Sequence, residues 1–151
     1  MAEEARKADV LKLAGEELEE LGELHRYFDR LSQRENWPVR LANDLLLCCE
    51  ELLTNTILYG YPDGRTPRSI VLEVASGRES VVITLSDDAM PYNPLLGSDP
   101  DLTLGVEDRP IGGLGVYFVK QIMDEVRYEL TEKGNRLILR KTFERTGEEQ
   151  A

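Results

Sequence analysis

Apolar residues recur at every second position in some segments of this chain and at helical spacing in others, and this order limits the available folds. Residues 70–74 and 81–85 each place an apolar side chain at alternate positions, and a short Ser-Gly-Arg-Glu loop joins them. Such a pair predicts an antiparallel β-hairpin. Segments 126–131 and 135–143 lie on either side of Glu-Lys-Gly and predict a second hairpin.

Helical spacing accounts for much of the remaining chain. Apolar residues recur at intervals of three and four after residue 16, and again from 38 to about 59, so two helices are predicted. We also expect a strand at 8–14 and a third helix from about 113 to 124. The order β, α, α, β, β, long loop, α, β, β predicts an α+β fold, a two-layer α/β sandwich. Its mixed, mostly antiparallel sheet would be covered on one face by helices.

Length and composition limit the class of protein. The 151 residues suggest one domain, for which we expect the limits 8–143, with a flexible N-terminus at 1–7 and a flexible tail at 144–151. We expect neither a signal peptide nor a membrane span. The net charge of −11 argues against direct binding to nucleic acid or to acidic membranes. The two cysteines, Cys48 and Cys49, are expected to be buried thiols in a reducing compartment, which favours a cytoplasmic location.

The second predicted helix carries two polar residues among apolar ones. Glu51 and Asn55 are four positions apart and therefore lie on one helix face. A carboxylate and an amide in an apolar setting need partners, and a cation carrying phosphates is one such partner. The alternative is that the pair forms the polar flank of a half-exposed helix.

Asp87 continues the alternating pattern of its strand. It follows the inward-facing positions of 81–85 by two residues, so its side chain is expected on the apolar face. A carboxylate there needs a hydrogen-bond donor, for which the exocyclic amine of adenine would serve. The alternative is that Asp87 caps the next turn, an interpretation that the following Asp88 and Pro91 favour.

A glycine-rich segment, Arg-Pro-Ile-Gly-Gly-Leu-Gly at 109–115, opens the third predicted helix. Glycines let backbone amides approach a ligand, and a helix N-terminus attracts phosphate. Position 118 is Phe, so the dinucleotide fingerprint is absent, and no Gly-Lys-Ser/Thr of a phosphate-binding loop occurs.

In this order and at these spacings, the segments resemble the nucleotide-binding boxes of the GHKL ATPases, which share the Bergerat fold. Within that family the chain looks most like the anti-sigma-factor serine/threonine kinases, which carry a histidine-kinase-like ATPase domain. The matching segments are ELLTNTILYGY at 51–61, SDDAMPYNP at 86–94, RPIGGLG at 109–115 and GNRLILRK at 134–141.

The resemblance implies a role for each candidate residue. Asn55 would ligate a magnesium ion that bridges the phosphates of ATP, and Glu51 would act as general base towards a hydroxyl group. Asp87 would accept a hydrogen bond from the adenine amine, and Arg109 would place positive charge near the γ-phosphate. The phosphates would meet the loop of Gly112, Gly113, Leu114 and Gly115, and residues 93–111 would form a mobile lid.

The chain departs from the family pattern at Ala89, where the first glycine box has glycine. A methyl group in a tight contact with adenine costs about 1–3 kcal/mol. We therefore expect roughly ten- to a hundredfold weaker nucleotide binding, which counts against phosphotransfer activity.

The implied function is an ATP-binding regulator of transcription that phosphorylates a serine or threonine on a small antagonist protein and sequesters a sigma factor or similar partner. ATP or ADP and Mg²⁺ are the implied ligands, and a homodimer is possible. Because of Ala89, a partner switch without kinase activity is the alternative. A domain that serves a histidine-kinase or phosphatase pathway is less favoured, because His25 lacks the Glu or Asp that a phospho-accepting helix would place after it. His25 lies on the apolar stripe of the first helix and is expected to be a packed core residue.

Overall fold

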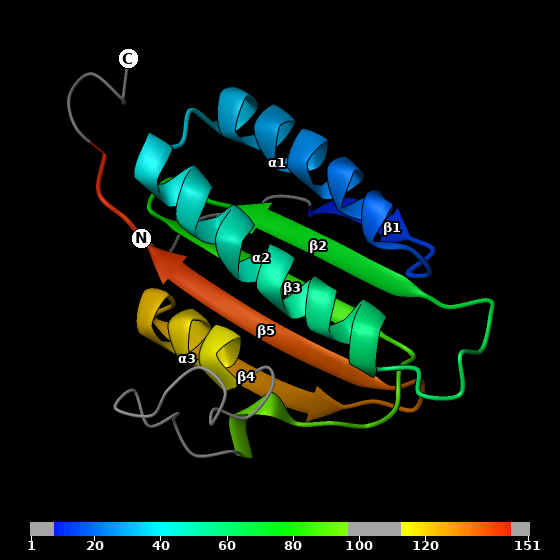
Figure 1. The fold of residues 1–151 in the computed structure, drawn as a ribbon. Coiled ribbons are helices and arrows are strands. Elements are labelled where there is room, and N and C mark those ends of the chain that lie inside the picture. Colours follow the sequence, from blue (N-terminus) through cyan, green and yellow to red (C-terminus); the bar gives the residue numbers. More distant parts are fainter. Residues whose placement is uncertain (1–7, 97–112, 146–151) are drawn as a thin grey trace.

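A single five-stranded sheet forms one layer of the protein (Figure 1). The computed structural model describes residues 8–96 and 113–145. The strands lie in the order β1-β2-β3-β5-β4, and all four pairings are antiparallel. The strands are β1 (Asp9–Leu13), β2 (Ile70–Ser76), β3 (Ser80–Asp87), β4 (Glu125–Leu130) and β5 (Asn135–Thr142).

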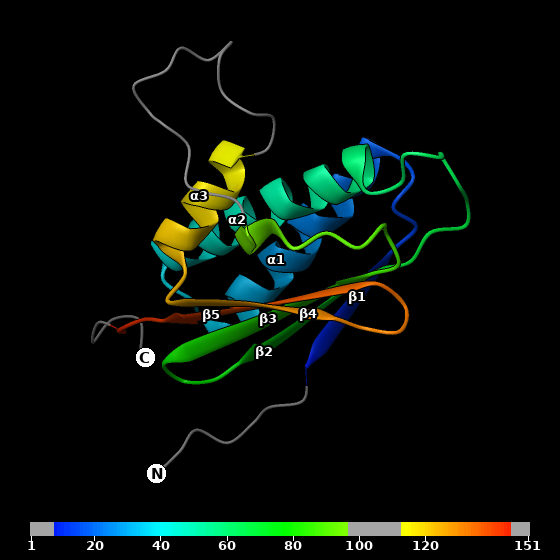
Figure 2. The ribbon, with the colours of Figure 1, turned by 90° about the horizontal axis from the view of Figure 1, so that it is seen from below.

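The helices form the second layer and cover one face of the sheet (Figure 2). They are α1 (Leu21–Glu35), α2 (Val39–Tyr59) and α3 (Gly113–Ile122), with short 3-10 turns at Leu18–Glu20 and Pro94–Leu96. The predicted two-layer α+β sandwich is confirmed. The sheet, which we expected to be mixed, is antiparallel at every pairing within the described residues.

The apolar residues that alternate along the predicted strands fill the core between the two layers. The apolar positions of β2 and β3 are 6% exposed or less, because each points from the sheet towards the helices. Cys48 and Cys49 are buried as free thiols, as predicted. The buried apolar residues of the two strands are Ile70, Leu72, Val74, Val81, Ile83 and Leu85.

Asn36 and Pro38 produce the sharp break between the first two helices. Asn36 adopts a left-handed conformation with φ 52°, which ends α1, and Pro38 occupies the N-cap of α2. Asparagine tolerates this conformation better than most residues. Trp37, between them, is buried, and its indole N–H donates to the Ser76 hydroxyl at 2.9 Å. The junction therefore anchors both helices to the end of β2.

His25 does not belong to the core, so the sequence prediction for this residue was wrong. Its side chain is 51% exposed and its ring nitrogen Nε2 lies 3.2 Å from a carboxylate oxygen of Glu50 on α2. The buried positions of α1 include Leu24 and Phe28, and a helix turns by about 100° per residue. His25 follows Leu24 directly and is thereby carried to the edge of the stripe, where it faces solvent.

Arg145 is held against the domain, although we expected it to lie in a flexible tail. Its guanidinium group donates to three backbone carbonyls, at 2.8 Å to Arg78, 2.6 Å to Asn36 and 3.1 Å to Glu35. These carbonyls belong to the β2–β3 turn and to the α1–α2 junction. Among the described residues, no helix combines the length and the apolar character needed to cross a bilayer.

Candidate nucleotide-binding site

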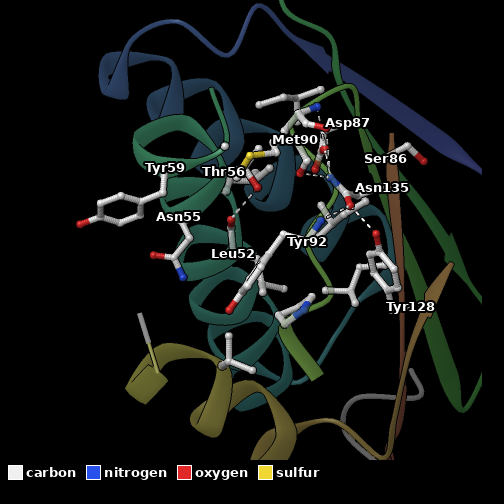
Figure 3. Close-up of a pocket in the computed structure, with 18 residues that line it drawn as sticks. Leu52, Asn55, Thr56, Tyr59, Ser86, Asp87, Met90, Tyr92, Tyr128 and Asn135 are labelled. Atoms are coloured by element: carbon white, nitrogen blue, oxygen red, sulfur yellow. Dashed lines mark hydrogen bonds between the residues drawn. The ribbon is translucent and has the colours of Figure 1, made fainter. Parts of the chain in front are cut away.

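A cavity of about 420 Å³ lies between the C-terminal half of α2 and the ends of β3 and β5 (Figure 3). Most of its wall is apolar, with a few polar groups, which is the usual composition of a small-molecule site. Asn55 and Tyr59 project from the helix side, and Asp87, Asn135 and Tyr128 lie on the sheet side. The apolar part of the wall includes Leu52, Leu53, Ile70, Leu85, Val116 and Leu137.

Asp87 occupies the last position of β3 and is directly opposite Asn135, the first residue of β5. Its carboxylate oxygen Oδ1 accepts two hydrogen bonds, from the Asn135 side-chain amide at 2.9 Å and from the Ala89 backbone N–H at 3.1 Å. The second bond means that Asp87 caps the following turn, as the alternative interpretation expected. Asp87 also lines the cavity, so its capping of the turn does not remove it from the cavity wall.

Burial raises the pKa of Asp87 above its ordinary value, and the neighbouring Asp88 carboxylate raises it further. The hydrogen bonds from Asn135 and from the Ala89 N–H act in the opposite direction, because they stabilise the ionised form. Asp87 is thus a partly desolvated acceptor at the sheet end of the cavity.

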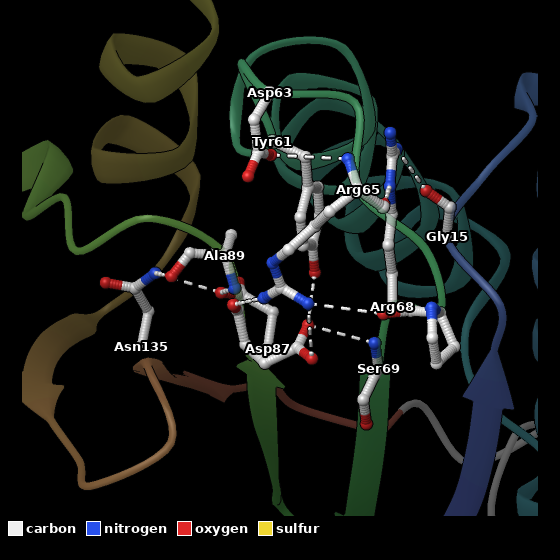
Figure 4. A network of polar contacts seen from close by, with 11 residues as sticks. Gly15, Tyr61, Asp63, Arg65, Arg68, Ser69, Asp87, Ala89 and Asn135 are labelled. Atoms are coloured by element: carbon white, nitrogen blue, oxygen red, sulfur yellow. Dashed lines mark hydrogen bonds and ion pairs between the residues drawn. The ribbon is translucent and has the colours of Figure 1, made fainter.

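Asp88 has a different environment, although it is the next residue in the sequence, and its partners Tyr61, Arg65 and Ser69 can be seen in Figure 4. Its Oδ1 accepts from the Tyr61 hydroxyl at 2.7 Å and from the Ser69 N–H at 2.9 Å, and its Oδ2 pairs with Arg65 at 3.4 Å. Partial burial opposes ionisation, but these hydrogen bonds and Arg65 outweigh it and lower the pKa of Asp88. Asp88 fixes the loop after α2 and does not line the cavity that Asp87 faces.

Asn55 and Glu51 lie one helical turn apart on α2 but differ in exposure. Asn55 is half-buried and lines the cavity, whereas Glu51 is exposed. We expected both side chains to lie in apolar surroundings and therefore to need partners. This expectation holds for the half-buried Asn55 and was wrong for the exposed Glu51. Glu51 lies against α3, since a Cβ placed on Gly115 would be 2.7 Å from a Glu51 carboxylate oxygen. The absence of a side chain at Gly115 is what leaves room for this carboxylate.

Ala89 is buried, and its methyl group lies beside Gly60 at the end of α2. A Cβ placed on Gly60 would be only 2.8 Å from the Ala89 methyl carbon. The backbone also connects the two segments, because the Met90 N–H donates to the Gly60 carbonyl at 2.9 Å. Ala89 has a negative φ, so no left-handed conformation requires glycine there.

The predicted glycine-rich loop is only partly described. Gly113 and Leu114 form the start of α3, and Gly115 is buried beside Glu51. Arg109 and Gly112 lie outside the described residues, as does most of the predicted lid. Asn55, Asp87 and Ala89 share one cavity, and Val116 of α3 also lines it.

Asn135 is the main site residue that the sequence argument missed. It lies on the same cavity wall as Asp87 and hydrogen-bonds to it. Tyr128, Met90 and Tyr92 also line the cavity without having been singled out. The available signal was the position of Asn135 at the start of a strand after Gly134, but recognising it requires knowing that β5 pairs with β3.

Comparison with known proteins agrees with this geometry. Residues 15–141 match the family of histidine kinase-like ATPase domains. This chain belongs to that family. Over 106 residues the domain is 30% identical to the anti-sigma F factor of Clostridium novyi (strain NT), and the alignment covers 65% of this chain and 68% of that protein. These matches confirm the resemblance to the GHKL ATPases and their anti-sigma-factor branch that the sequence indicated.

The described part of this ATPase domain offers few protein ligands for a magnesium ion. Within the described ranges, no group of three His, Cys, Asp or Glu side chains could hold a metal. Mg²⁺ usually keeps several waters and binds through one or two protein oxygens together with substrate phosphates. The amide oxygen of Asn55 at the cavity wall fits that donor set, provided that phosphates supply most of the remaining ligands.

Proposed function

We propose that the chain binds Mg-ATP in this cavity, with the adenine ring between the apolar walls and its amine directed at Asp87. The observation that carries the proposal is the position of the Asp87 carboxylate, half-buried on the cavity wall and held through Oδ1 by two donors. A carboxylate that is held in a fixed direction favours ligands that carry a hydrogen-bond donor at the matching position. ATP binding is the activity expected of the family.

The phosphates would extend from the cavity towards the start of α3. Asn55 would provide a magnesium ligand, and the backbone amides from Gly112 to Gly115 would contact the phosphate oxygens at the helix N-terminus. Arg109 would add positive charge near the γ-phosphate. Since phosphoryl transfer depends mainly on positioning and charge neutralisation, this small set of groups is sufficient.

Glu51 is the proposed general base. The hydroxyl oxygen of a serine or threonine would attack the γ-phosphorus, and the bond from that phosphorus to the β–γ bridging oxygen would break. ADP would leave with that oxygen, and the hydroxyl proton would pass to the Glu51 carboxylate. The exposure of Glu51 supports this role, because a protein substrate must reach the base from solvent.

The similarity to an anti-sigma F factor supports a role as a partner-switching regulator. The phosphate acceptor would be a small antagonist protein, and the sequestered partner a sigma factor or similar regulator. We further propose a cytoplasmic location and a possible homodimer. The proteins encoded by neighbouring genes are the first candidates to test as partners.

Calorimetry with Mg-ATP and Mg-ADP tests the binding step. Asp87→Asn should lose most of the affinity, because Asn135 and the Ala89 N–H would keep the new amide oxygen and the amide NH2 group would then face the ligand amine, donor against donor. Asp88→Asn is the matched control, since Asp88 lies outside the cavity and contacts Tyr61 and Arg65. Absence of heat with wild type at millimolar nucleotide would reject ATP binding.

Labelled ATP and a candidate antagonist protein test the transfer step. Glu51→Gln should abolish transfer to the antagonist, whereas Glu50→Gln should retain it. Glu50 is the adjacent carboxylate on α2, and it contacts His25 at a distance of 3.2 Å. Equal transfer by both variants would remove Glu51 from the mechanism.

A partner switch without phosphotransfer remains the second candidate, and Ala89 in place of glycine is the observation that favours it. Under this alternative the domain would bind nucleotide and its partners without transferring phosphate. Nucleotide binding by wild type without transfer to any antagonist would support this alternative.

A further inference from the structure

The side-chain amide of Asn135 is hydrogen-bonded at both of its ends. Nδ2 donates to Asp87 Oδ1 at 2.9 Å and to the Met90 carbonyl at 3.1 Å. Oδ1 accepts from the Tyr92 backbone N–H at 2.9 Å and from the Tyr128 hydroxyl. This single amide therefore joins the ends of β3 and β5 to strand β4 and to the segment that follows β3 (Figure 3).

These partners fix which way the amide points. A backbone N–H can only donate, so the atom of Asn135 that faces the Tyr92 N–H must be the oxygen. The Met90 carbonyl can only accept, so the atom that faces it must be the nitrogen. The group presented to the Asp87 carboxylate is consequently a donor.

Asp87 is thereby held as an acceptor. Within the described residues, both hydrogen bonds to its carboxylate reach Oδ1, from Asn135 and from the Ala89 N–H. A ligand that meets the rest of the carboxylate must offer a donor to satisfy it. An amino group at C6 of a purine offers one, whereas an oxo group at C6 is an acceptor and faces the carboxylate with like polarity.

We propose that Asn135 is a positioning residue that holds Asp87 as an acceptor and so sets the preference of the cavity for 6-aminopurine nucleotides over 6-oxopurine nucleotides. This inference rests on the proposed binding of ATP. It gives a role to Asn135, a residue to which the sequence resemblance assigned none, and that role is the choice between two purines.

Loss of the Asn135 donor should relax this choice. Without it, burial and the neighbouring Asp88 charge would favour the protonated Asp87 carboxyl, since only the Ala89 N–H would remain to stabilise the ionised form. A protonated carboxyl can donate to an oxo group as well as accept from an amine. The affinity for ATP should fall, and the affinity for inosine triphosphate should fall less or rise.

Calorimetry of Mg-ATP and Mg-inosine triphosphate tests the proposal, because the two nucleotides differ at C6. Wild type should bind ATP at least about tenfold more tightly, the effect of one hydrogen bond to a charged group. Asn135→Val should reduce the ratio of the two affinities to within about threefold. A ratio in Asn135→Val equal to that of wild type would overturn the proposal, as would equal binding of both nucleotides by wild type.

Thr131→Val provides the matched control. The Thr131 hydroxyl bonds to Gly134 in the turn that precedes Asn135, and Thr131 does not line the cavity. This variant should lower the thermal unfolding temperature and keep the wild-type ratio. If it reduced the ratio as much as Asn135→Val does, general loosening of the turn would explain the effect and the proposal would fail.

The result also separates this inference from the function on which it rests. If wild type binds neither nucleotide, the proposed ATP site is wrong and the assignment to Asn135 falls with it. If wild type prefers ATP and Asn135→Val retains that preference, ATP binding stands and only the assignment to Asn135 fails.

Discussion

The methyl group of Ala89 occupies the space beside Gly60 that a side chain at residue 60 would need. A Cβ on Gly60 would lie 2.8 Å from that methyl carbon and 2.6 Å from the Thr56 carbonyl oxygen. Gly60→Ala should therefore destabilise the domain by about 1–3 kcal/mol, through overpacking against backbone that cannot move freely. The midpoint of urea unfolding measures this change.

Gly22→Ala is the control for that substitution. Gly22 lies in α1, and a Cβ there would meet only the end of the Arg26 side chain, at 3.5 Å. Alanine favours helix over glycine by roughly 1 kcal/mol, so this variant should be neutral or more stable. An equal loss of stability in both variants would contradict the packing argument.

Ala89→Gly should have a small effect on nucleotide affinity. The sequence alone suggested that the methyl group weakens binding roughly ten- to a hundredfold. Its position beside Gly60 predicts instead a change below about threefold, together with a loss of stability of about 1 kcal/mol from the lost packing and the added backbone freedom. Calorimetry with Mg-ATP on both proteins decides between these expectations, and a tenfold gain would restore the earlier one.

Gly134→Ala should be among the most damaging single substitutions at this end of the sheet. A Cβ at Gly134 would lie 2.3 Å from the Asp87 carbonyl oxygen and 2.9 Å from the Asp88 Cα, both of which are backbone atoms. We expect a loss of roughly 2–4 kcal/mol, measured by urea unfolding.

Gly64→Ala separates this clash from backbone strain. Gly64 has φ +68°, and no other atom lies within 4 Å of a Cβ placed there. Its substitution should cost about 1–2 kcal/mol from the left-handed conformation alone. If Gly64→Ala costs as much as Gly134→Ala, the close approach of Gly134 to β3 is not the cause.

Asp88 should make the stability depend on pH in the acid range. Its pKa is lowered in the folded state from an ordinary value of 3.8, so its contribution is complete above that value and is lost as the pH falls through the folded-state pKa. The unfolding temperature of wild type should exceed that of Asp88→Asn by a constant amount near neutrality. The difference should shrink below about pH 4.

Asp87→Asn should show the opposite trend. The pKa of Asp87 is raised in the folded state, so ionising it costs stability as the pH rises through the acid range. Relative to wild type, the Asp87→Asn variant should become more stable as the pH increases. Parallel curves for both variants would contradict the different environments of these neighbouring carboxylates.

The two cysteines should be unreactive in the folded protein. Burial raises the pKa of Cys48 to about 12 and that of Cys49 well above its ordinary value, so neither is a thiolate at neutral pH. Ellman's reagent should modify neither thiol in native protein at pH 8 and both in urea. Rapid modification of the native protein would show that α2 opens locally.

The order and type of the main elements were predictable because their apolar residues follow clear periods. The β2–β3 hairpin and the end of α2 before Gly60 lie where the sequence placed them. The spacing of apolar residues along a helix does not show where its buried face ends. For that reason His25, which lies at the edge of the buried face of α1, was wrongly placed in the core. The same limit applies to Glu51, which is exposed although most of the residues around it in the second helix are apolar.

The candidate site was predictable only where its residues follow a local pattern. Asp87 and Asn55 occupy recognisable positions on a strand and a helix, and both line the cavity. Asn135 could not be recognised, because its partner lies 48 positions earlier in the chain and the two meet only when β5 pairs with β3. The exposure of Glu51 likewise depends on how α3 packs against α2.

The contacts of Arg145 set a practical lower limit on the size of the folding unit. A protein cut after residue 144 would lose the guanidinium group that joins the β2–β3 turn to the α1–α2 junction. A protein cut after residue 145 would keep it. Attempts to shorten this chain for crystallisation or for fusion to another domain should therefore spare Arg145, even though it follows the last strand.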